Sequence, residues 1–268
     1  MKIISLNIEG NFHLPDRVIP FLKNEAADII CLQEVFRSDL TRLAAILKMT
    51  VKFVPMAMIT PGSKDLTAGE IGIAQLVNPS WSITNWSSEY YFSSVSQPLP
   101  KFIRYQGDPN VLWRALLWVE LTKNEQTYVI ATTHFTWSPE GNLTNDQIRD
   151  WLNLEKILKR FPRLILNGDF NSPRQGGPDN IYHRLARLYQ DQIPPQIITT
   201  VDPQLHRIKS LNLVVDGLFT TPDYQINNVH LVSGVSDHQA VVAEVFPSPV
   251  PPGGIARLDR HNPETDQN

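Results

Sequence analysis

The chain has 268 residues, of which 42% are hydrophobic, and this suffices for one large core or two small domains. With 24 basic and 27 acidic residues the formal net charge is −3, which excludes a polycation that coats nucleic acid but leaves room for a local basic face. The single cysteine, Cys31, excludes an internal disulfide. It lies in an apolar run and is interpreted as a small buried hydrophobe.

The N-terminal residues enter an apolar run directly, with no long apolar h-region and no cleavage pattern, so no signal peptide is expected. No run approaches the ~20 apolar residues of a membrane-spanning helix. Together with the lone cysteine, these features favour a cytoplasmic protein without stable membrane insertion. We expect it to act as a monomer.

The first half of the chain alternates between strand-like and helix-like patterns. Ser38 is expected to cap a helix. Residues 81–92 are rich in Trp, Tyr, Ile and Ser, which suits a strand or hairpin, whereas the prolines of residues 93–110 indicate a long surface loop. The predicted strands are 3–8, 28–32, 51–55 and 71–77, and the predicted helices are 15–27 and 38–48.

The second half begins with a predicted hairpin around Lys123-Asn124-Glu125, formed by residues 111–121 and 127–133. Since strands outnumber helices and helices punctuate them in both halves, we expect stacked sheets covered by helices. One domain should span residues 1–246, followed by a disordered tail over 247–268 that is rich in Pro, Gly and charge. The remaining predicted helices are 145–159 and 181–188, and the remaining strands are 164–166, 211–219, 225–231 and 239–246.

Polar side chains recur where predicted strands end or begin. One such residue is explained by a turn, but six strand edges that share acids, amides and histidines favour a common site. Because side chains alternate along a strand, those of Asp169 and Asn171 would point to the same face of the sheet. Carboxylate ligands favour Mg²⁺ or Mn²⁺, whereas no His or Cys pair has zinc-ligand spacing. The residues at these edges are Asn7, Gln33-Glu34, His134, Asp169 with Asn171, Asp216, and Asp237-His238.

These segments stand in the order found in the endonuclease/exonuclease/phosphatase superfamily, and the chain resembles it over roughly residues 1–246. Members include DNase I, abasic-site endonucleases, sphingomyelinases, inositol-polyphosphate 5-phosphatases and tyrosyl-DNA phosphodiesterase 2. The resemblance implies an α+β fold of the DNase I type, a four-layer α/β/β/α sandwich of two packed mixed sheets flanked by helices. The matching segments are Ser5-Leu6-Asn7, Leu32-Gln33-Glu34, Thr133-His134, Asn167-Gly168-Asp169-Phe170-Asn171, Val215-Asp216-Gly217-Leu218-Phe219 and Ser236-Asp237-His238.

The resemblance also implies the roles of the site residues in a Mg²⁺- or Mn²⁺-dependent attack of water, in line, on a phosphodiester. Glu34 is expected to be the principal metal ligand, with Asn7 and Asp237 close to the metal. Asp169 would orient and deprotonate the water, and Asn171 would hold the water or the phosphate. The remaining three residues would act on the phosphate: His238 as a donor, Asp216 as the partner that keeps His238 cationic, and His134 as a contact to the phosphate or the leaving group.

Three further residues are candidates for binding the substrate. Arg114 could meet a phosphate or form a salt bridge at a strand edge, and Arg174 could reach a phosphate or remain solvated. Trp137 could stack on a base or ring, although packing at the rim or in the core is the favoured explanation. Glu70 is a speculative partner of His134.

The leading hypothesis for function is a nuclease or DNA-end-processing phosphodiesterase. Lys101, Arg104 and Tyr105 interleave charge with an aromatic ring, as surfaces that bind nucleic-acid strands do. A phospholipid, sphingomyelin or inositol-phosphate hydrolase is the alternative, because the aromatic residues within 81–92 could touch a membrane. A non-catalytic phosphate-binding module on the same scaffold is the third hypothesis.

Overall fold

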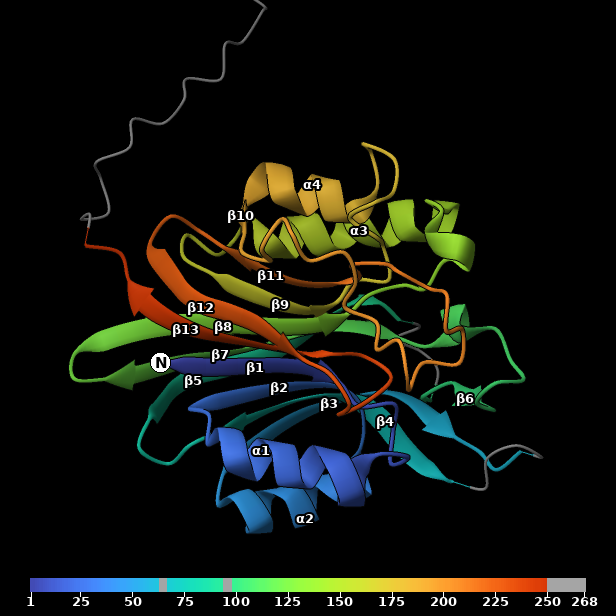
Figure 1. Cartoon of the computed structure of the whole chain (residues 1–268), viewed down its shortest axis with the longest axis horizontal. Helices are drawn as coiled ribbons and strands as arrows, with labels where there is room; N and C mark the ends of the chain where they lie inside the picture. Colours follow the sequence, from blue (N-terminus) through green and yellow to red (C-terminus); the bar gives the residue numbers. More distant parts are fainter. Residues whose placement is uncertain (63–66, 94–97, 250–268) are drawn as a thin grey trace, which may run out of the picture.

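The computed structural model describes residues 1–62, 67–93 and 98–249. Two mixed sheets of seven and six strands pack face to face, and helices cover the outer face of each sheet (Figure 1). This arrangement confirms the predicted four-layer α/β/β/α sandwich. Most of the tail predicted to be disordered, residues 250–268, lies outside the described residues.

The seven-stranded sheet, called the first sheet below, has the strand order β12-β13-β1-β2-β4-β3-β6. Strand β1 runs parallel to β2 and antiparallel to β13, so the first and last strands of the chain are neighbours. The strands of this sheet are β1 (Lys2–Asn7), β2 (Ile29–Phe36), β3 (Thr50–Ile59), β4 (Gly69–Val77), β6 (Lys101–Phe102), β12 (Tyr224–Val232) and β13 (Ala240–Pro247).

The six-stranded sheet, called the second sheet, has the order β10-β11-β9-β8-β7-β5. Strands β7 and β8 form the predicted hairpin, and the turn residues Asn124 and Glu125 both have positive φ. Strand β8 runs parallel to β9, which brings His134 opposite Asp169. The strands are β5 (Ser82–Phe92), β7 (Arg114–Lys123), β8 (Gln126–His134), β9 (Ile165–Asp169), β10 (Gln190–Asp191) and β11 (Asp216–Thr220).

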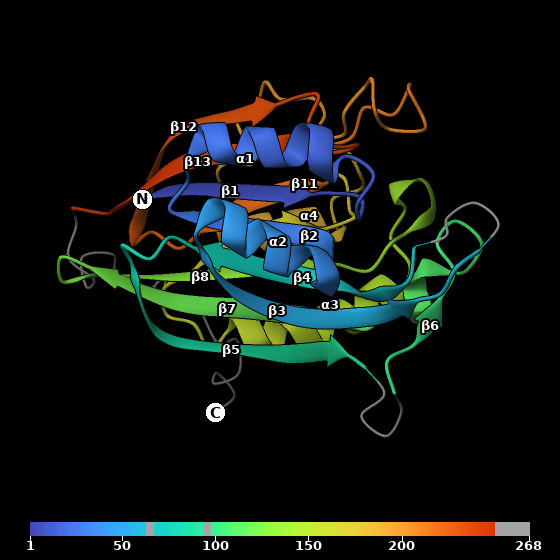
Figure 2. The same cartoon turned by 90° about the horizontal axis from the view of Figure 1, so that it is seen from below.

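Four helices form the outer layers (Figures 1 and 2). Helix α1 (Ile19–Glu25), which continues a π-helical turn, and α2 (Arg37–Leu47) cover the first sheet, whereas α3 (Asn145–Leu158) and α4 (Ile181–Leu188) cover the second. The predicted cap is wrong: α2 begins directly after β2, and no side chain caps it. Within the described part of the chain, every helix is too short or too polar to cross a bilayer.

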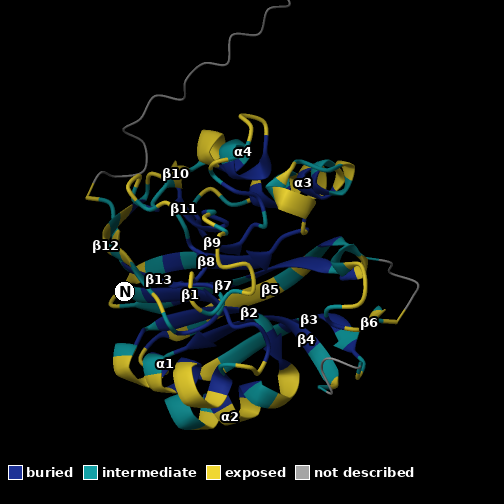
Figure 3. Ribbon diagram, turned by 45° about the vertical axis from the view of Figure 1, so that its right-hand side comes forward, coloured by how far each residue is buried: buried dark blue, intermediate teal, exposed yellow. Residues whose placement is uncertain are grey.

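Alternation along β1 and β2 divides the core into layers. Ile4 and Leu6 belong to the cluster that packs under α1 and α2, whereas Ile3 and Cys31 belong to the cluster shared with the second sheet. Figure 3 shows the central strands buried and exposed residues on the outward sides of the helices. The hydrophobic effect therefore fixes which way the polar strand-end residues point.

The structure moves several predicted strand boundaries. Strand β2 continues to Phe36 through a bulge, so Glu34 lies within a strand and not at its end. Strand β11 begins at Asp216, so the strand predicted over 211–219 is confirmed only from Asp216 onward. Residues 82–92 form one strand, and β6, which pairs with β3, lies within the predicted loop 93–110.

We expect Gly168→Ala to destabilise the protein by at least about 2 kcal/mol, because overpacking and forbidden backbone angles each cost about 1–3 kcal/mol. Gly168 has φ +139°, and an added Cβ would lie 2.0 Å from the Thr133 carbonyl oxygen of the neighbouring strand β8. Denaturant unfolding measures the change. Gly177→Ala, where an added Cβ meets nothing within 4 Å, is the control. Equal stability of the two variants would contradict the close approach of β8 and β9.

Cys31 is expected to resist thiol reagents in the native protein. Its side chain is fully buried, and burial raises the pKa of the thiol to about 12, so almost no thiolate exists near neutral pH. Reaction with dithiobis-nitrobenzoate should be slower than in guanidinium by a factor on the order of 10³ or more. Rapid labelling of the native protein would show that the interface between the sheets opens readily.

Candidate active site

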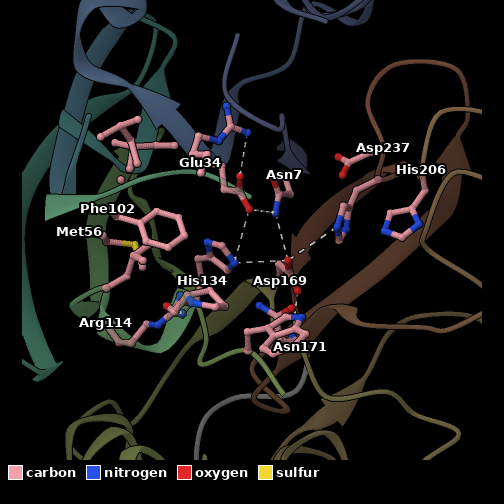
Figure 4. A pocket seen from close by; sticks show the side chains of 18 residues that line it. Asn7, Glu34, Met56, Phe102, Arg114, His134, Asp169, Asn171, His206 and Asp237 are labelled. Atoms are coloured by element: carbon pink, nitrogen blue, oxygen red, sulfur yellow. Dashed lines mark hydrogen bonds and ion pairs between the residues drawn. The ribbon is translucent and has the colours of Figure 1, made fainter. Parts of the chain in front are cut away.

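A pocket of about 220 Å³ lies where the carboxyl ends of β1 and β8 meet the end of β9 and the bulge of β2 (Figure 4). Side chains from both sheets line it, so the pocket exists only because the two sheets pack together. Most of the predicted site residues converge on it. Those that line it are Asn7, Glu34, Arg114, His134, Trp137, Asp169, Asn171, Asp237 and His238.

The side-chain amide of Asn7 joins the two sheets in this pocket. Its Nδ2 donates to Asp169 Oδ2 at 3.1 Å and to Glu34 Oε1 at 3.3 Å. Its Oδ1 accepts a hydrogen bond from the backbone N–H of Glu9 at 3.1 Å, which fixes the orientation of the amide. One side chain on β1 therefore holds two carboxylates from different sheets within hydrogen-bond reach.

Glu34 owes its position to an irregularity in β2. Its φ is +55°, an uncommon value for a residue other than glycine, and the bulge re-aims the side chain into the pocket. The side chain is 28% exposed, and its Oε2 lies 3.6 Å from Nη2 of Arg104. Strained backbone at such a position is typical of functional sites.

Asp169 is buried, and burial raises the pKa of its carboxyl above the usual value. Its Oδ1 accepts the backbone N–H of Asn171 at 2.9 Å. Asn171 has φ +48°, and its Nδ2 donates to the carbonyl of Phe135 at 3.0 Å. Both residues reach the pocket, but a left-handed turn after β9 places Asn171 there, so strand alternation is the wrong explanation.

His238 is held as a cation by two carboxylates. Its Nδ1 lies 2.8 Å from Asp216 Oδ2, and its Nε2 lies 3.8 Å from Asp169 Oδ2. Burial alone would lower the pKa of His238, but the charges of Asp216 and Asp169 raise it well above the usual value. Asp216 does not line the pocket, but its charge acts on two residues that do, because it raises the pKa of His238 and contributes to the raised pKa of Asp169.

His134, in contrast to His238, is neutral near neutral pH. Burial lowers the pKa of His134 to about 3, and the attraction of Asp169 only partly offsets this. Its Nε2 lies 3.6 Å from Asp169 Oδ2 and 3.9 Å from Glu34 Oε1. A neutral imidazole and an imidazolium therefore lie on either side of one carboxylate.

Two groups of side chains offer ligand atoms to a metal ion. Asp169, Asp216 and His238 have ligand atoms within 4.8 Å of one another, so this buried group could hold a metal. Protonation of His238 opposes that use. The oxygens of Glu34 and Asp237 lie in the same pocket, and burial raises the pKa of Asp237 to about 7. Carboxylate oxygens gathered in this way fit a hard divalent cation.

The three residues predicted to bind the substrate lie in different surroundings. Arg114 is 1% exposed and donates to the carbonyls of His134 at 3.3 Å and Pro109 at 2.9 Å, so the predicted salt bridge at a strand edge is wrong. Trp137 is 41% exposed at the rim of the pocket. Arg174 lies away from the pocket, where its guanidinium donates to backbone carbonyls of residues 193–197.

Two predicted contacts are corrected by the structure. Glu70 pairs with Arg37 and not with His134. Arg104 is buried at 4% exposure, and its guanidinium carbon lies 5.2 Å from the Phe12 ring centroid and 5.0 Å from that of Tyr105. It lines the pocket and therefore does not belong to an open strand-binding surface.

Sequence reasoning missed the place of Arg104 in the pocket and missed His206 altogether. The Nδ1 atom of His206 lies within hydrogen-bond distance of the backbone of Ile208, in a loop with no regular strand. No strand end or motif marks it. The position of Arg104 beside Tyr105 marks it as a candidate for substrate binding. The sequence pattern does not show that its guanidinium points into the pocket.

Solved structures share this architecture. The endonuclease/exonuclease/phosphatase from Bacteroides vulgatus has a TM-score of 0.67 at 18% identity, covering 92% of this chain and 98% of that one. The human Nocturnin catalytic domain with bound sulfate has a TM-score of 0.65 at 16% identity, with coverages of 92% and 93%. Humanised TDP2 from D. rerio has a TM-score of 0.59 at 16% identity, with coverages of 92% and 98%.

At these identities the structural likeness shows the fold alone. No curated protein matches the chain at a significant level. The sequence pattern of the Endonuclease/Exonuclease/phosphatase family, in contrast, matches residues 4–238, which include every polar strand-edge residue described above. The chain therefore belongs to the endonuclease/exonuclease/phosphatase family.

Proposed function

We propose that this protein is a Mg²⁺- or Mn²⁺-dependent phosphodiesterase that directs water in line at phosphorus. The observation that supports this best is the convergence of Glu34, Asp169 and His238 on one pocket from both sheets. A buried carboxylate lies between a neutral and a cationic histidine, which supplies both a proton acceptor and a donor to a developing anion.

Glu34, with Asn7 and Asp237 beside it, would hold the divalent cation. The cation would neutralise charge on the phosphoryl group. Asn7 contributes a second effect, because its amide holds the carboxylates of Glu34 and Asp169 in place before any ligand arrives. Such preorganisation lowers the cost of arranging the site during the reaction.

Asp169 is the candidate general base. Its raised pKa makes it a better proton acceptor than an exposed aspartate, and the N–H of Asn171 fixes its orientation. On the other side, His238 carries a proton on Nε2 that can be donated to a phosphoryl oxygen. Neutral His134 can donate one hydrogen bond to the phosphate or to the leaving group without adding charge.

The structure changes the weight of the substrate hypotheses. Lys101 is exposed, but Arg104 is buried against Glu34, and Tyr105 donates to Glu9 at 3.1 Å. The loop that contains Lys101, Arg104 and Tyr105 therefore supports nucleic-acid binding less strongly than the alternation of charged and aromatic residues in its sequence indicates. The lipid hypothesis loses part of its support as well, because Trp81 and Tyr91 are buried in the core, whereas Trp86 is 45% exposed. A compact pocket favours one phosphoester group with its adjoining substituent.

The proposal predicts metal-dependent hydrolysis that depends on Asp169. Asp169→Ala should lower kcat for bis(p-nitrophenyl) phosphate by about 10²–10⁴-fold, because a positioned general base contributes that much. Glu34→Gln should raise the Mg²⁺ concentration needed for half-maximal activity. Asp179→Ala, which alters an exposed acid far from the pocket, is the control.

The same assay should cover p-nitrophenyl phosphate, DNA with and without an abasic site, 5′-tyrosyl DNA, sphingomyelin and inositol phosphates. Hydrolysis of a diester establishes the phosphodiesterase, and cleavage of DNA establishes the nuclease arm. If wild type and Asp169→Ala are equally inert on every substrate, the hydrolase proposal fails and the non-catalytic phosphate-binding hypothesis gains.

Asp216→Asn should shift the pH profile of kcat. The carboxylate of Asp216 raises the pKa of His238, so without it burial dominates and the imidazolium loses its proton at lower pH. Activity that needs the cation is present below that pKa and lost above it. The alkaline limb should therefore move to lower pH, with a loss of about 10²–10³-fold near pH 8. Asp191→Asn, at a partly buried acid outside the pocket, should leave the profile unchanged.

A further inference from the structure

We propose that one end of the pocket is a subsite for an aromatic substituent of the substrate, so that the preferred substrates are phosphoesters that carry a flat apolar group. This inference rests on the proposed function, because it assigns the substrate class of the same site. The apolar subsite is defined by the side chains of Met56, Ile59, Ile71, Phe102 and Leu112, all of which line the pocket.

The apolar subsite lies at one end of the cavity, beside the carboxylates at its centre. Figure 4 shows Met56 and Phe102 on one side and Asp237 and His206 on the other, with Glu34, His134 and Asp169 between them. A phosphate placed at the central carboxylates would therefore direct one substituent toward Phe102.

Packing keeps this wall in place. Met56, Ile59 and Ile71 are 1–3% exposed and lie on the adjacent strands β3 and β4. Phe102 belongs to the two-residue strand β6, which pairs with the end of β3. Its side chain packs against the hydrophobic cluster that contains Leu112. The wall is therefore preformed, as substrate pockets usually are.

Arg114 supplies an independent sign of a ligand. Its side chain is 1% exposed and lines the pocket, and among the described residues its Nε has no hydrogen-bond acceptor. A buried donor without a partner is costly, so an acceptor oxygen from a substrate would relieve that cost. Arg114 lies beside His134 in Figure 4, on the side toward Met56. An ester oxygen between the phosphate and an aromatic ring satisfies this donor.

Other substituents fit this end of the pocket less well. The hydroxyl groups of a sugar would lose water without gaining partners on an apolar wall. A second phosphate would lose its hydration there, and at the opposite end it would face the carboxylate of Asp237. An aromatic ring loses only apolar hydration and packs on the flat face of Phe102.

The test is calorimetric binding of phenylphosphonate and methylphosphonate in the presence of Mg²⁺, with cyclohexylphosphonate to separate ring stacking from apolar contact. Wild type should bind phenylphosphonate at least about tenfold more tightly than methylphosphonate, since even one methylene in an apolar pocket discriminates by about 10–200-fold. Phe102→Ser should lower that ratio to less than about threefold. It should leave methylphosphonate binding within about twofold, which also reports that the variant folds.

The control is Ile103→Ser, because the neighbouring Ile103 is 38% exposed and does not line the pocket. It should keep the wild-type ratio, and Phe102→Leu should give an intermediate one. A ratio near one in wild type, an unchanged ratio in Phe102→Ser, or no binding of either phosphonate would overturn the subsite. The hydrolysis assay tests the proposed function independently of the subsite. A protein that is inert but still prefers phenylphosphonate refutes the proposed function alone. An active protein without that preference refutes the subsite alone.

Discussion

The hydrogen bond from Asn7 to Asp169 is the contact on which the site depends, because it joins the ends of two sheets whose described strands share no backbone pairing. Two other amides span the same interface: Gln33 donates to Thr132 Oγ1 at 2.9 Å, and Gln75 donates to the carbonyl of Ile130 at 3.0 Å. Apolar packing between sheets is nearly non-directional, whereas a buried amide is costly unless it finds its partner. We infer that these bonds set how far one sheet can slide over the other.

The electrostatics of the site follow from that alignment. His134 and His238 approach the same carboxylate oxygen of Asp169 at 3.6 and 3.8 Å, yet their pKa values move in opposite directions. Asp216 is a second carboxylate beside His238, whereas His134 feels the positive charges of Arg114 and His238, which lower its pKa further. One carboxylate therefore lies between two histidines of different charge, one neutral and one cationic.

Part of this arrangement could be read from the sequence. Asn7 and His134 end predicted strands, and parallel pairing with β2 and β9 places each at the carboxyl end of its own sheet, so the strand pattern together with the family resemblance locates them. The sequence places Glu34 in the site but does not predict the bulge in β2. A residue with positive φ inside a strand does not change the pattern of hydrophobic residues around it. The pattern of Leu211–Val215 looks like a strand, yet these residues pair with no strand and Asp216 starts β11 instead.

Residues that act through tertiary contacts could not be found in this way. Arg104 and Arg114 read as surface cations, yet both are buried, because surrounding rings and carbonyls replace the water that each guanidinium loses. His206 enters the pocket from a loop whose path no local pattern specifies. Arg174 shows the reverse outcome: it lies close in sequence to Asn171, but neighbouring carbonyls bind it elsewhere.

The short and irregular outer strands have a consequence for self-association. An open sheet edge is a template on which another chain can add a strand. Here β6 and β10 offer only two residues each at their edges. At the other two edges, β5 and β12 carry bulges that break the regular spacing of free backbone groups. The bulged edges at β5 and β12 are thereby poor templates for a further strand, which disfavours edge-to-edge association through them.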